Sequence, residues 1–144
     1  MNLLKIARKP PIIVLPQDSV MKAVEKMVKN KVGGVAVEEN GVLVGIFTER
    51  DLQTRVVHKH LSALDTPVSE VMTRDPHTAP VEMEASAAFE FMTSQHFRHL
   101  PIVDENGKIL GMLSVRHLMA RIVEYLSHEL ESMNAYIGAD GIGG

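Results

Sequence analysis

The stretch Gly45-Ile-Phe-Thr-Glu-Arg-Asp51 decides the fold because it returns, in outline, as Gly111-Met-Leu-Ser-Val-Arg-His117. In each copy a glycine and an apolar strand end lead to a hydroxyl residue, and a polar side chain follows three residues later. The final residues, Asp51 and His117, are 66 positions apart (117 − 51), as are the two hydroxyl residues. A recurrence of this kind indicates an internal duplication. Because the last position changes from a carboxylate to an imidazole, we expect two sites with different properties.

The duplication extends to both sides of these stretches. Pro11–Val20 aligns with Pro76–Ala85, and Gly34–Val37 aligns with His99–Ile102. The alignment of the two copies continues after one residue is inserted in the turn Asp104–Gly107 of the second copy. Each copy contains, in order, an apolar run, a helical pattern, two strands joined by an Asn-Gly turn, and a second helical pattern. This order predicts an α/β (α+β) fold of two β-α-β-β-α repeats.

The length of the chain constrains how the repeats are arranged. At 144 residues the chain fits one domain. A repeat of about 60 residues buries too little surface to be stable alone, so we expect the copies to share a core as a pseudo-two-fold pair. We assign repeat 1 to residues 8–60, a linker with one short helix to 61–74, repeat 2 to 75–126, and a C-terminal helix extension with a glycine-rich tail to 127–144.

The last helix is expected to continue past the end of repeat 2. Its apolar stripe consists of Leu118, Ile122, Tyr125, Leu126, Leu130, Met133 and Ile137. The stripe could pack back on the module or be covered by a partner chain. Because an exposed apolar face of this length is costly, we favour a homodimer formed partly through this helix. The tail Gly138–Gly144 is expected to be mobile.

Composition and charge exclude several classes of protein. The chain has no cysteine, which excludes disulfides and thiolate metal sites. Its formal net charge is −3 and it has no long basic run, so nucleic-acid binding is not favoured. No apolar segment reaches the roughly 20 residues that span a bilayer, and residues 1–8 lack the apolar stretch of a signal peptide. We therefore expect a cytoplasmic protein without a membrane segment.

The hydroxyl-x-x-acid pattern from Thr48 to Asp51 has two interpretations. At the start of a helix, the hydroxyl can cap unpaired N–H groups and the carboxylate can complement the helix dipole. That interpretation is sufficient for an isolated pattern. An ionised carboxylate is also a pure acceptor that can bind both hydroxyls of a ribose. The place of the pattern within a duplicated unit favours this second role.

The arrangement resembles a tandem pair of CBS domains (the cystathionine-β-synthase type), often called a Bateman module. The resemblance covers about residues 8–126. It is carried by Val14-x-Pro16-x-x-Ser19-Val20, Gly45-x-x-Thr48-x-x-Asp51, Val71-Met-Thr73, His99-x-Pro101-Ile-Val-Asp104 and Gly111-x-x-Ser114. The resemblance implies a regulatory module that requires no cofactor. It would bind AMP, ADP, ATP or S-adenosylmethionine between the repeats and commonly assemble as a flat dimer.

The resemblance also implies roles for individual residues of the nucleotide site. Asp51 would hold the ribose hydroxyls, and Thr48 would support the ribose or the phosphate. The adenine would lie against the first strand of the opposite repeat, at Thr78 and Ala79.

A basic pair would complete this nucleotide site. Arg98 and His99 match the family's basic pair ahead of the second strand and would face the phosphate. The corresponding residues of repeat 1 are Gly33 and Gly34, so basic groups are supplied from one side only.

A second, weaker site is expected at Val14, Ser114 and His117. A neutral imidazole offers one acceptor and a protonated imidazole offers none, whereas a carboxylate offers several. The second cleft would therefore be weak, empty or specialised for another ligand.

Other residues give weaker signals. The histidines do not form a metal-site pattern, and no catalytic motif is present, so we expect neither a metal nor an enzyme. Arg55, His58, Lys59 and His60 are read as a solvated basic helix end. The alternative to a ligand sensor is a protein-interaction or scaffold dimer with no nucleotide ligand. Either protein would act on a client that the sequence does not identify.

Overall fold

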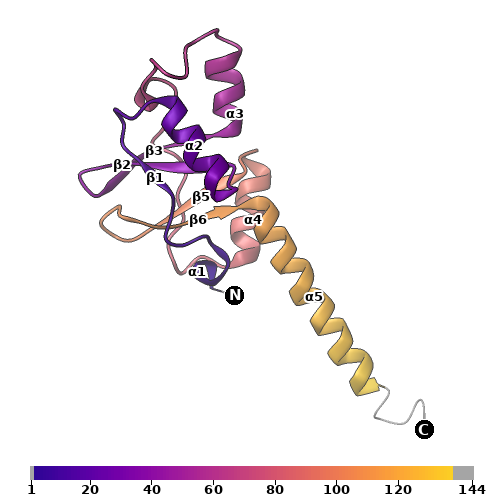
Figure 1. Ribbon diagram of the computed structural model, residues 1–144. Helices are drawn as coiled ribbons and strands as arrows, with labels where there is room; N and C mark the ends of the chain where they lie inside the picture. The colour runs from indigo at the N-terminus through magenta and orange to yellow at the C-terminus, as the bar shows by residue number, and fades with distance from the viewer. Residues whose placement is uncertain (1, 138–144) are drawn as a thin grey trace.

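The computed structural model describes residues 2–137. It confirms an α+β fold of two repeats with a long C-terminal helix (Figure 1). Repeat 1 contains β1 (Ile13–Val14), α2 (Val20–Asn30), β2 (Gly34–Glu39), β3 (Val42–Thr48), α3 (Glu49–Asp51) and the π-helical segment η1 (Leu52–Val57). Repeat 2 contains α4 (Ala85–Ser94), β5 (His99–Val103), β6 (Ile109–Ser114) and α5 (Val115–Ile137). The other elements are α1 (Leu3–Ile6), the 3-10 helix η2 (Val68–Glu70) and β4 (Thr73–Arg74).

The strands form two sheets. The first sheet has the order β1-β2-β3-β4, with β1 parallel to β2 and the other neighbours antiparallel. The second sheet is the antiparallel pair β5-β6. The strand expected at Thr78–Ala79 is reduced to one parallel bridge between Ala79 and Ile102. In that bridge the Ala79 N–H donates to Pro101 O at 2.9 Å and Ala79 O accepts from the Val103 N–H at 3.0 Å, and Pro80, whose ring fixes φ, follows directly.

Local sequence signals position the helix and turn of repeat 1. Ser19 caps α2 by accepting a hydrogen bond from the backbone N–H of Lys22 at 3.1 Å. The hairpin between β2 and β3 turns at Asn40 and Gly41, whose φ angles are 54° and 78°. Both residue types tolerate positive φ, which explains the Asn-Gly signal.

The two valines that follow α3 differ in burial. The side chain of Val57 is 63% exposed, whereas Val56 is 1% exposed and packs in the core of repeat 1. The physical reason is the π-helical segment after α3, whose wider turns change the angular position of the residues that follow.

Each repeat is completed by the segment that leads into the other repeat. Leu3 and Ile6 of α1 are buried in the core of repeat 2, beside α4 and α5. Val68 and Met72, which lead into repeat 2, are buried in the core of repeat 1. The strands follow the same exchange, because β4 pairs with β3 while Arg8 bridges to Met112 in β6. Leu3 and Val68 are 65 positions apart (68 − 3), so the exchange follows the duplication.

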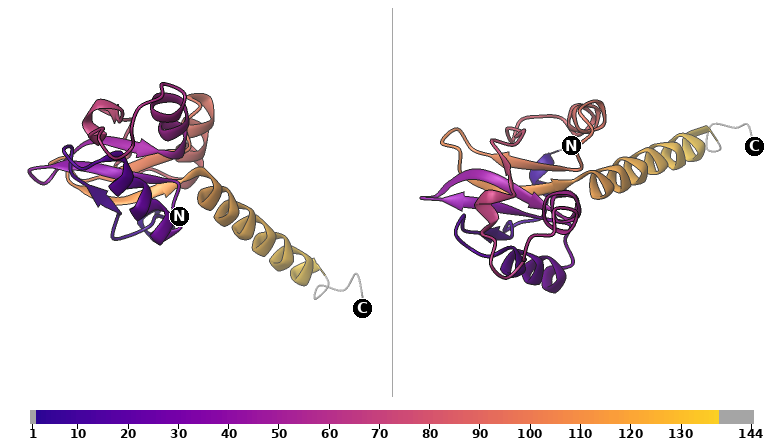
Figure 2. Two further views of the ribbon diagram at one scale, coloured as in Figure 1. Left: turned by 45° about the horizontal axis from the view of Figure 1, so that its top comes forward. Right: turned by 90° about the horizontal axis from the view of Figure 1, so that it is seen from above.

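The two repeats meet through their sheets. Ala36 and Ile46 of the first sheet form one buried cluster with Ile109 and Met112 of the second. In Figure 2 the strands of the two repeats occupy the middle of the module, with α2 on one side and α4 on the other. The hairpin tips also touch, since the Leu43 N–H donates to Gly107 O at 3.1 Å. The shared core places the ends of β3 and β5 at one seam.

The C-terminal helix leaves the module. Only its first turns pack on repeat 2, where Leu118 is fully buried and Ile122 is partly buried. Beyond that point α5 projects away from both sheets (Figures 1 and 2), and the stripe residues from Leu126 to Ile137 are at least 42% exposed. The stripe therefore does not pack back on its own module. The tail expected to be mobile lies outside the described residues. Within residues 2–137, none of the helices is both long and apolar enough for a bilayer crossing.

Candidate functional site

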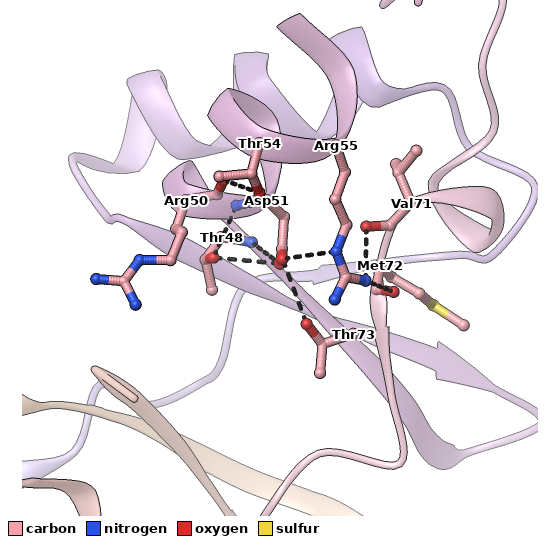
Figure 3. A network of polar contacts seen from close by, with 8 residues as sticks. All are labelled: Thr48, Arg50, Asp51, Thr54, Arg55, Val71, Met72 and Thr73. Atoms are coloured by element: carbon pink, nitrogen blue, oxygen red, sulfur yellow. Dashed lines mark hydrogen bonds and ion pairs between the residues drawn. The ribbon is translucent and has the colours of Figure 1, made fainter. Parts of the chain in front are cut away.

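The candidate site is centred on Asp51, where β3 ends and α3 begins. The Thr48 hydroxyl accepts a hydrogen bond from the backbone N–H of Asp51 at 3.3 Å, and Asp51 Oδ2 accepts one from the backbone N–H of Thr48 at 3.0 Å (Figure 3). The Thr48 hydroxyl also lies 3.2 Å from Asp51 Oδ2. This reciprocal cap confirms the helix-capping role of the pattern. It also fixes the carboxylate, of which only a small part is exposed, at one position.

Two further residues contact the same carboxylate. The Thr73 hydroxyl donates to Asp51 Oδ1 at 3.3 Å, and Arg55 Nε lies 3.7 Å from that oxygen. Arg55 Nη1 also donates to Met72 O at 2.8 Å. Sequence reasoning missed this role and assigned Arg55 to a solvated basic helix end. The available signal was its position four residues after Asp51, where opposite charges on a helix meet.

The glycines of the duplicated motif give room to crossing segments. A Cβ at Gly45 would lie 2.6 Å from Met72 Sδ and 2.8 Å from Thr73 O, distances that real Cβ contacts do not reach. A Cβ at Gly111 would lie 3.1 Å from Arg8 O. Each glycine therefore lets the segment that precedes the opposite repeat, its lead-in segment, pass close to the strand. At Gly45, this close passage brings Thr73 within reach of Asp51.

His99 of repeat 2 lies next to the cap of repeat 1. A Cβ built on Gly34 would lie 3.1 Å from His99 Cδ2 and 3.3 Å from Thr48 Cγ2. A Cβ built on Gly33 would lie 3.3 Å from His99 Nε2 and 2.9 Å from Glu49 Oε1. The imidazole therefore occupies part of the space that side chains at these two positions would take. The structure brings His99, Thr48 and Asp51 together across the seam.

Burial favours the neutral form of the His99 imidazole. Desolvation lowers the pKa of the imidazole below its usual value of 6.5, and the exposed Arg98 beside it acts in the same direction. The nearby carboxylates of Glu49 and Asp51 oppose this effect and raise the pKa. The net pKa shift is downward, so the free protein presents a neutral imidazole at neutral pH.

The residues expected to contact adenine lie on repeat 2 ahead of α4. Thr78 is exposed, whereas Ala79 is fully buried in the core of repeat 2. A ligand at this position would meet the side chain of Thr78 but only the backbone of Ala79. Their contact with a nucleotide stays a prediction, as does that of Arg98.

The second predicted site keeps the hydroxyl cap of the first but differs from it at other positions. The Ser114 hydroxyl accepts a hydrogen bond from the backbone N–H of His117 at 3.2 Å, so the cap is retained, but His117 is exposed. Arg8, 65 positions before Thr73 (73 − 8), takes the place of that hydroxyl residue on β6. Val14 is buried in the core of repeat 1, so its side chain does not line an open cleft. A ligand role for the three predicted residues stays a prediction.

Across residues 2–137, no group of three or more histidine, aspartate or glutamate side chains is arranged to hold a metal ion.

The fold and its capped hydroxyl-x-x-acid site define a paired module of the CBS type. The family model described as "CBS domain" matches the chain twice, at residues 4–58 and 68–124. The chain belongs to the CBS-domain family. Both matches begin close to the exchanged lead-in segments, α1 and η2.

Relatives support this assignment. The meiotically up-regulated gene 70 protein of Schizosaccharomyces pombe is 36% identical over 121 residues, which cover 84% of this chain but 17% of that protein. The CBS-domain protein ATU1752 from Agrobacterium tumefaciens has 28% sequence identity and a TM-score of 0.74, covering 84% of this chain and 98% of that one. The CBS-domain protein PAE2072 from Pyrobaculum aerophilum, solved in complex with AMP, has 25% identity and a TM-score of 0.72, covering 81% and 89%.

Proposed function

We propose that the protein is a non-catalytic regulatory module of the cytoplasm that binds an adenosine-type ligand at Asp51. The ligand would be AMP, ADP, ATP or S-adenosylmethionine, and its binding would report energy or metabolite status to a client protein. The observation that carries the proposal is the Asp51 carboxylate, fixed at the seam between the repeats. The AMP complex of PAE2072 supports an adenosine ligand for a protein of the same family.

The hydrogen bonds of Asp51 support a diol as its ligand. Hydroxyl–oxygen bonds are usually about 2.7–2.8 Å long. The hydroxyls of Thr48 and Thr73 lie 3.2 and 3.3 Å from the carboxylate, so both contacts are weak. The two hydroxyls of a ribose can replace them with shorter bonds to a charged acceptor. The bond from the Thr48 N–H would be retained, so α3 would stay capped.

The phosphate would lie on the side of repeat 2. His99 is next to Thr48, and Arg98 precedes it in the chain with an exposed side chain. A ligand held by Asp51, by the Arg98 guanidinium and by an N–H of the neutral His99 imidazole would contact both repeats. It would therefore favour the arrangement in which the repeats are closest, and shift the population toward it.

Calorimetric titration of the intact protein with AMP, ADP, ATP and S-adenosylmethionine tests the proposal. At least one ligand should bind, and at 100-fold excess over its Kd it should raise the free energy of unfolding by about 2.7 kcal/mol. No turnover of the bound ligand is expected. The proposal fails if none of the four ligands binds or raises the unfolding midpoint.

We also propose self-association through α5, because its exposed stripe is otherwise uncovered. The first part of the helix carries Arg116 and Arg121, whereas the part after it carries Glu124, Glu129 and Glu131. An antiparallel pairing of two copies would bring the basic part of each helix beside the acidic part of the other. A parallel pairing would bring the acidic parts together. This interface is also what the scaffold alternative would use.

Sedimentation analysis tests the interface. The wild-type protein should be a dimer at tens of micromolar, and Leu130→Lys should shift it to monomer because a charge would enter the apolar stripe. His128→Lys is the matched control, since residues two apart lie roughly 200° apart around a helix. A monomeric wild type, or equal effects of the two variants, would refute self-association through this stripe.

A further inference from the structure

One carboxylate connects the candidate ligand site with the segment that leads into repeat 2. Asp51 Oδ1 receives the Thr73 hydroxyl at 3.3 Å and faces Arg55 Nε at 3.7 Å (Figure 3). Thr73 belongs to β4, which is part of the first sheet but directly precedes repeat 2. Asp51 therefore contacts, through a single oxygen, the chain segment that joins the repeats.

The contact from Thr73 can be lost without loss of the strand. Thr73 pairs with Ile46 of β3 through the backbone, and Arg55 holds the preceding residue by donating to Met72 O at 2.8 Å. The hydroxyl bond is long for its type, and a change of the Thr73 side chain to another staggered rotamer would turn the donor away from Asp51. The Thr73 hydroxyl is thus a weak and replaceable partner of Asp51.

The other oxygen of the carboxylate has less freedom. Asp51 Oδ2 accepts from the backbone N–H of Thr48, and this bond belongs to the cap of α3. A ligand that engaged only this oxygen would compete with the cap. Oδ1 has no backbone donor among the described residues, so it is the oxygen that a ligand hydroxyl can take at the lowest cost.

We infer that Thr73 is a positioning residue whose hydroxyl occupies Asp51 Oδ1 in the free protein and yields it to a ribose hydroxyl. The inference rests on the proposed binding of an adenosine-type ligand at Asp51 and adds a competitor within the chain. In the free protein, Thr73 ties the lead-in of repeat 2 to the carboxylate. In the complex, the ligand takes that oxygen and the tie is released. Ligand binding and the contact between Thr73 and Asp51 then compete for the same oxygen.

This competition predicts that a substitution next to the binding site raises the ligand affinity, whereas most such substitutions lower it. Thr73→Val keeps the shape of the side chain but removes the hydroxyl, so AMP should bind about 3- to 10-fold more tightly. Thr73→Ser restores a hydroxyl and should bind AMP as the wild type does. Thr54→Val is the matched control, because the Thr54 hydroxyl bonds Arg50 O and does not contact Asp51.

Deoxy analogues identify the competing ligand group. With one of the two analogues, 2′-deoxy-AMP or 3′-deoxy-AMP, the gain in affinity from Thr73→Val should disappear. That analogue is the one that lacks the hydroxyl which binds Oδ1. Calorimetry of the four proteins with the three nucleotides gives the complete comparison. Unchanged or weaker AMP binding by Thr73→Val, with wild-type binding intact, would overturn the inference alone. Absence of AMP binding to the wild type would overturn the inference, while binding of another of the four ligands would leave the proposed function standing.

Discussion

Replacing Asp51 with alanine should lower the affinity for the adenosine-type ligand by about 30-fold or more. The carboxylate would supply the charged acceptor for the ribose hydroxyls, and losing such bonds costs on the order of 2–4 kcal/mol. His117→Ala, at the corresponding position of repeat 2, should change the affinity by less than about twofold, since the exposed imidazole offers at most one acceptor. Calorimetric titration of the three proteins measures both effects.

The same carboxylate caps α3, so the loss of affinity has to be separated from a loss of stability. Asp51→Asn retains an oxygen that can accept the Thr48 N–H, so its unfolding midpoint should stay close to that of the wild type. Its ligand affinity should still fall strongly, because the charge is absent. A stronger effect from His117→Ala than from Asp51→Ala would move the working site to the second cleft.

Replacing Leu3 with alanine should lower the free energy of unfolding by about 2–5 kcal/mol. Leu3 is fully buried although it precedes the first strand of repeat 1, and its side chain completes the core of repeat 2. Small domains are stable by only about 5–15 kcal/mol, so this loss is a large part of the total. Urea unfolding monitored by circular dichroism measures the effect.

Lys5→Ala is the matched control for Leu3→Ala. Lys5 lies in the same short helix, α1, but its side chain is exposed. The control should change the free energy of unfolding by less than about 0.5 kcal/mol. If Leu3→Ala had an effect as small as that of the control, α1 would not be part of the folded core in solution.

The parts of the fold that local sequence determines were predictable. The Asn-Gly turn expected between the strands of repeat 1 is present at Asn40 and Gly41, and the cap at Ser19 likewise depends on residues close together in the chain. The duplication was readable because both copies keep the same order of glycine, hydroxyl and polar residues. The capping role of Thr48 and Asp51 followed from their spacing alone.

The contacts that complete the site depend on residues far apart in the chain. Arg55 reaches Met72, 17 positions further on, and Thr73 reaches back to Asp51 across 22 positions. Neither pair has a periodic pattern that marks it. α1 was missed because four residues are too few to show helical periodicity, and Leu3 is buried only by the other repeat.

The exchange of lead-in segments has a consequence for recombination of this gene with those of its relatives. A single crossover in the linker would join α1 and repeat 1 of this protein to repeat 2 of a relative. The core of that foreign repeat 2 would be shaped to pack against a different α1. Repeat 1 would in turn have to accept a foreign strand beside Gly45. Stable chimeras of such modules therefore need breakpoints chosen so that each exchanged segment and the core that it completes come from the same parent.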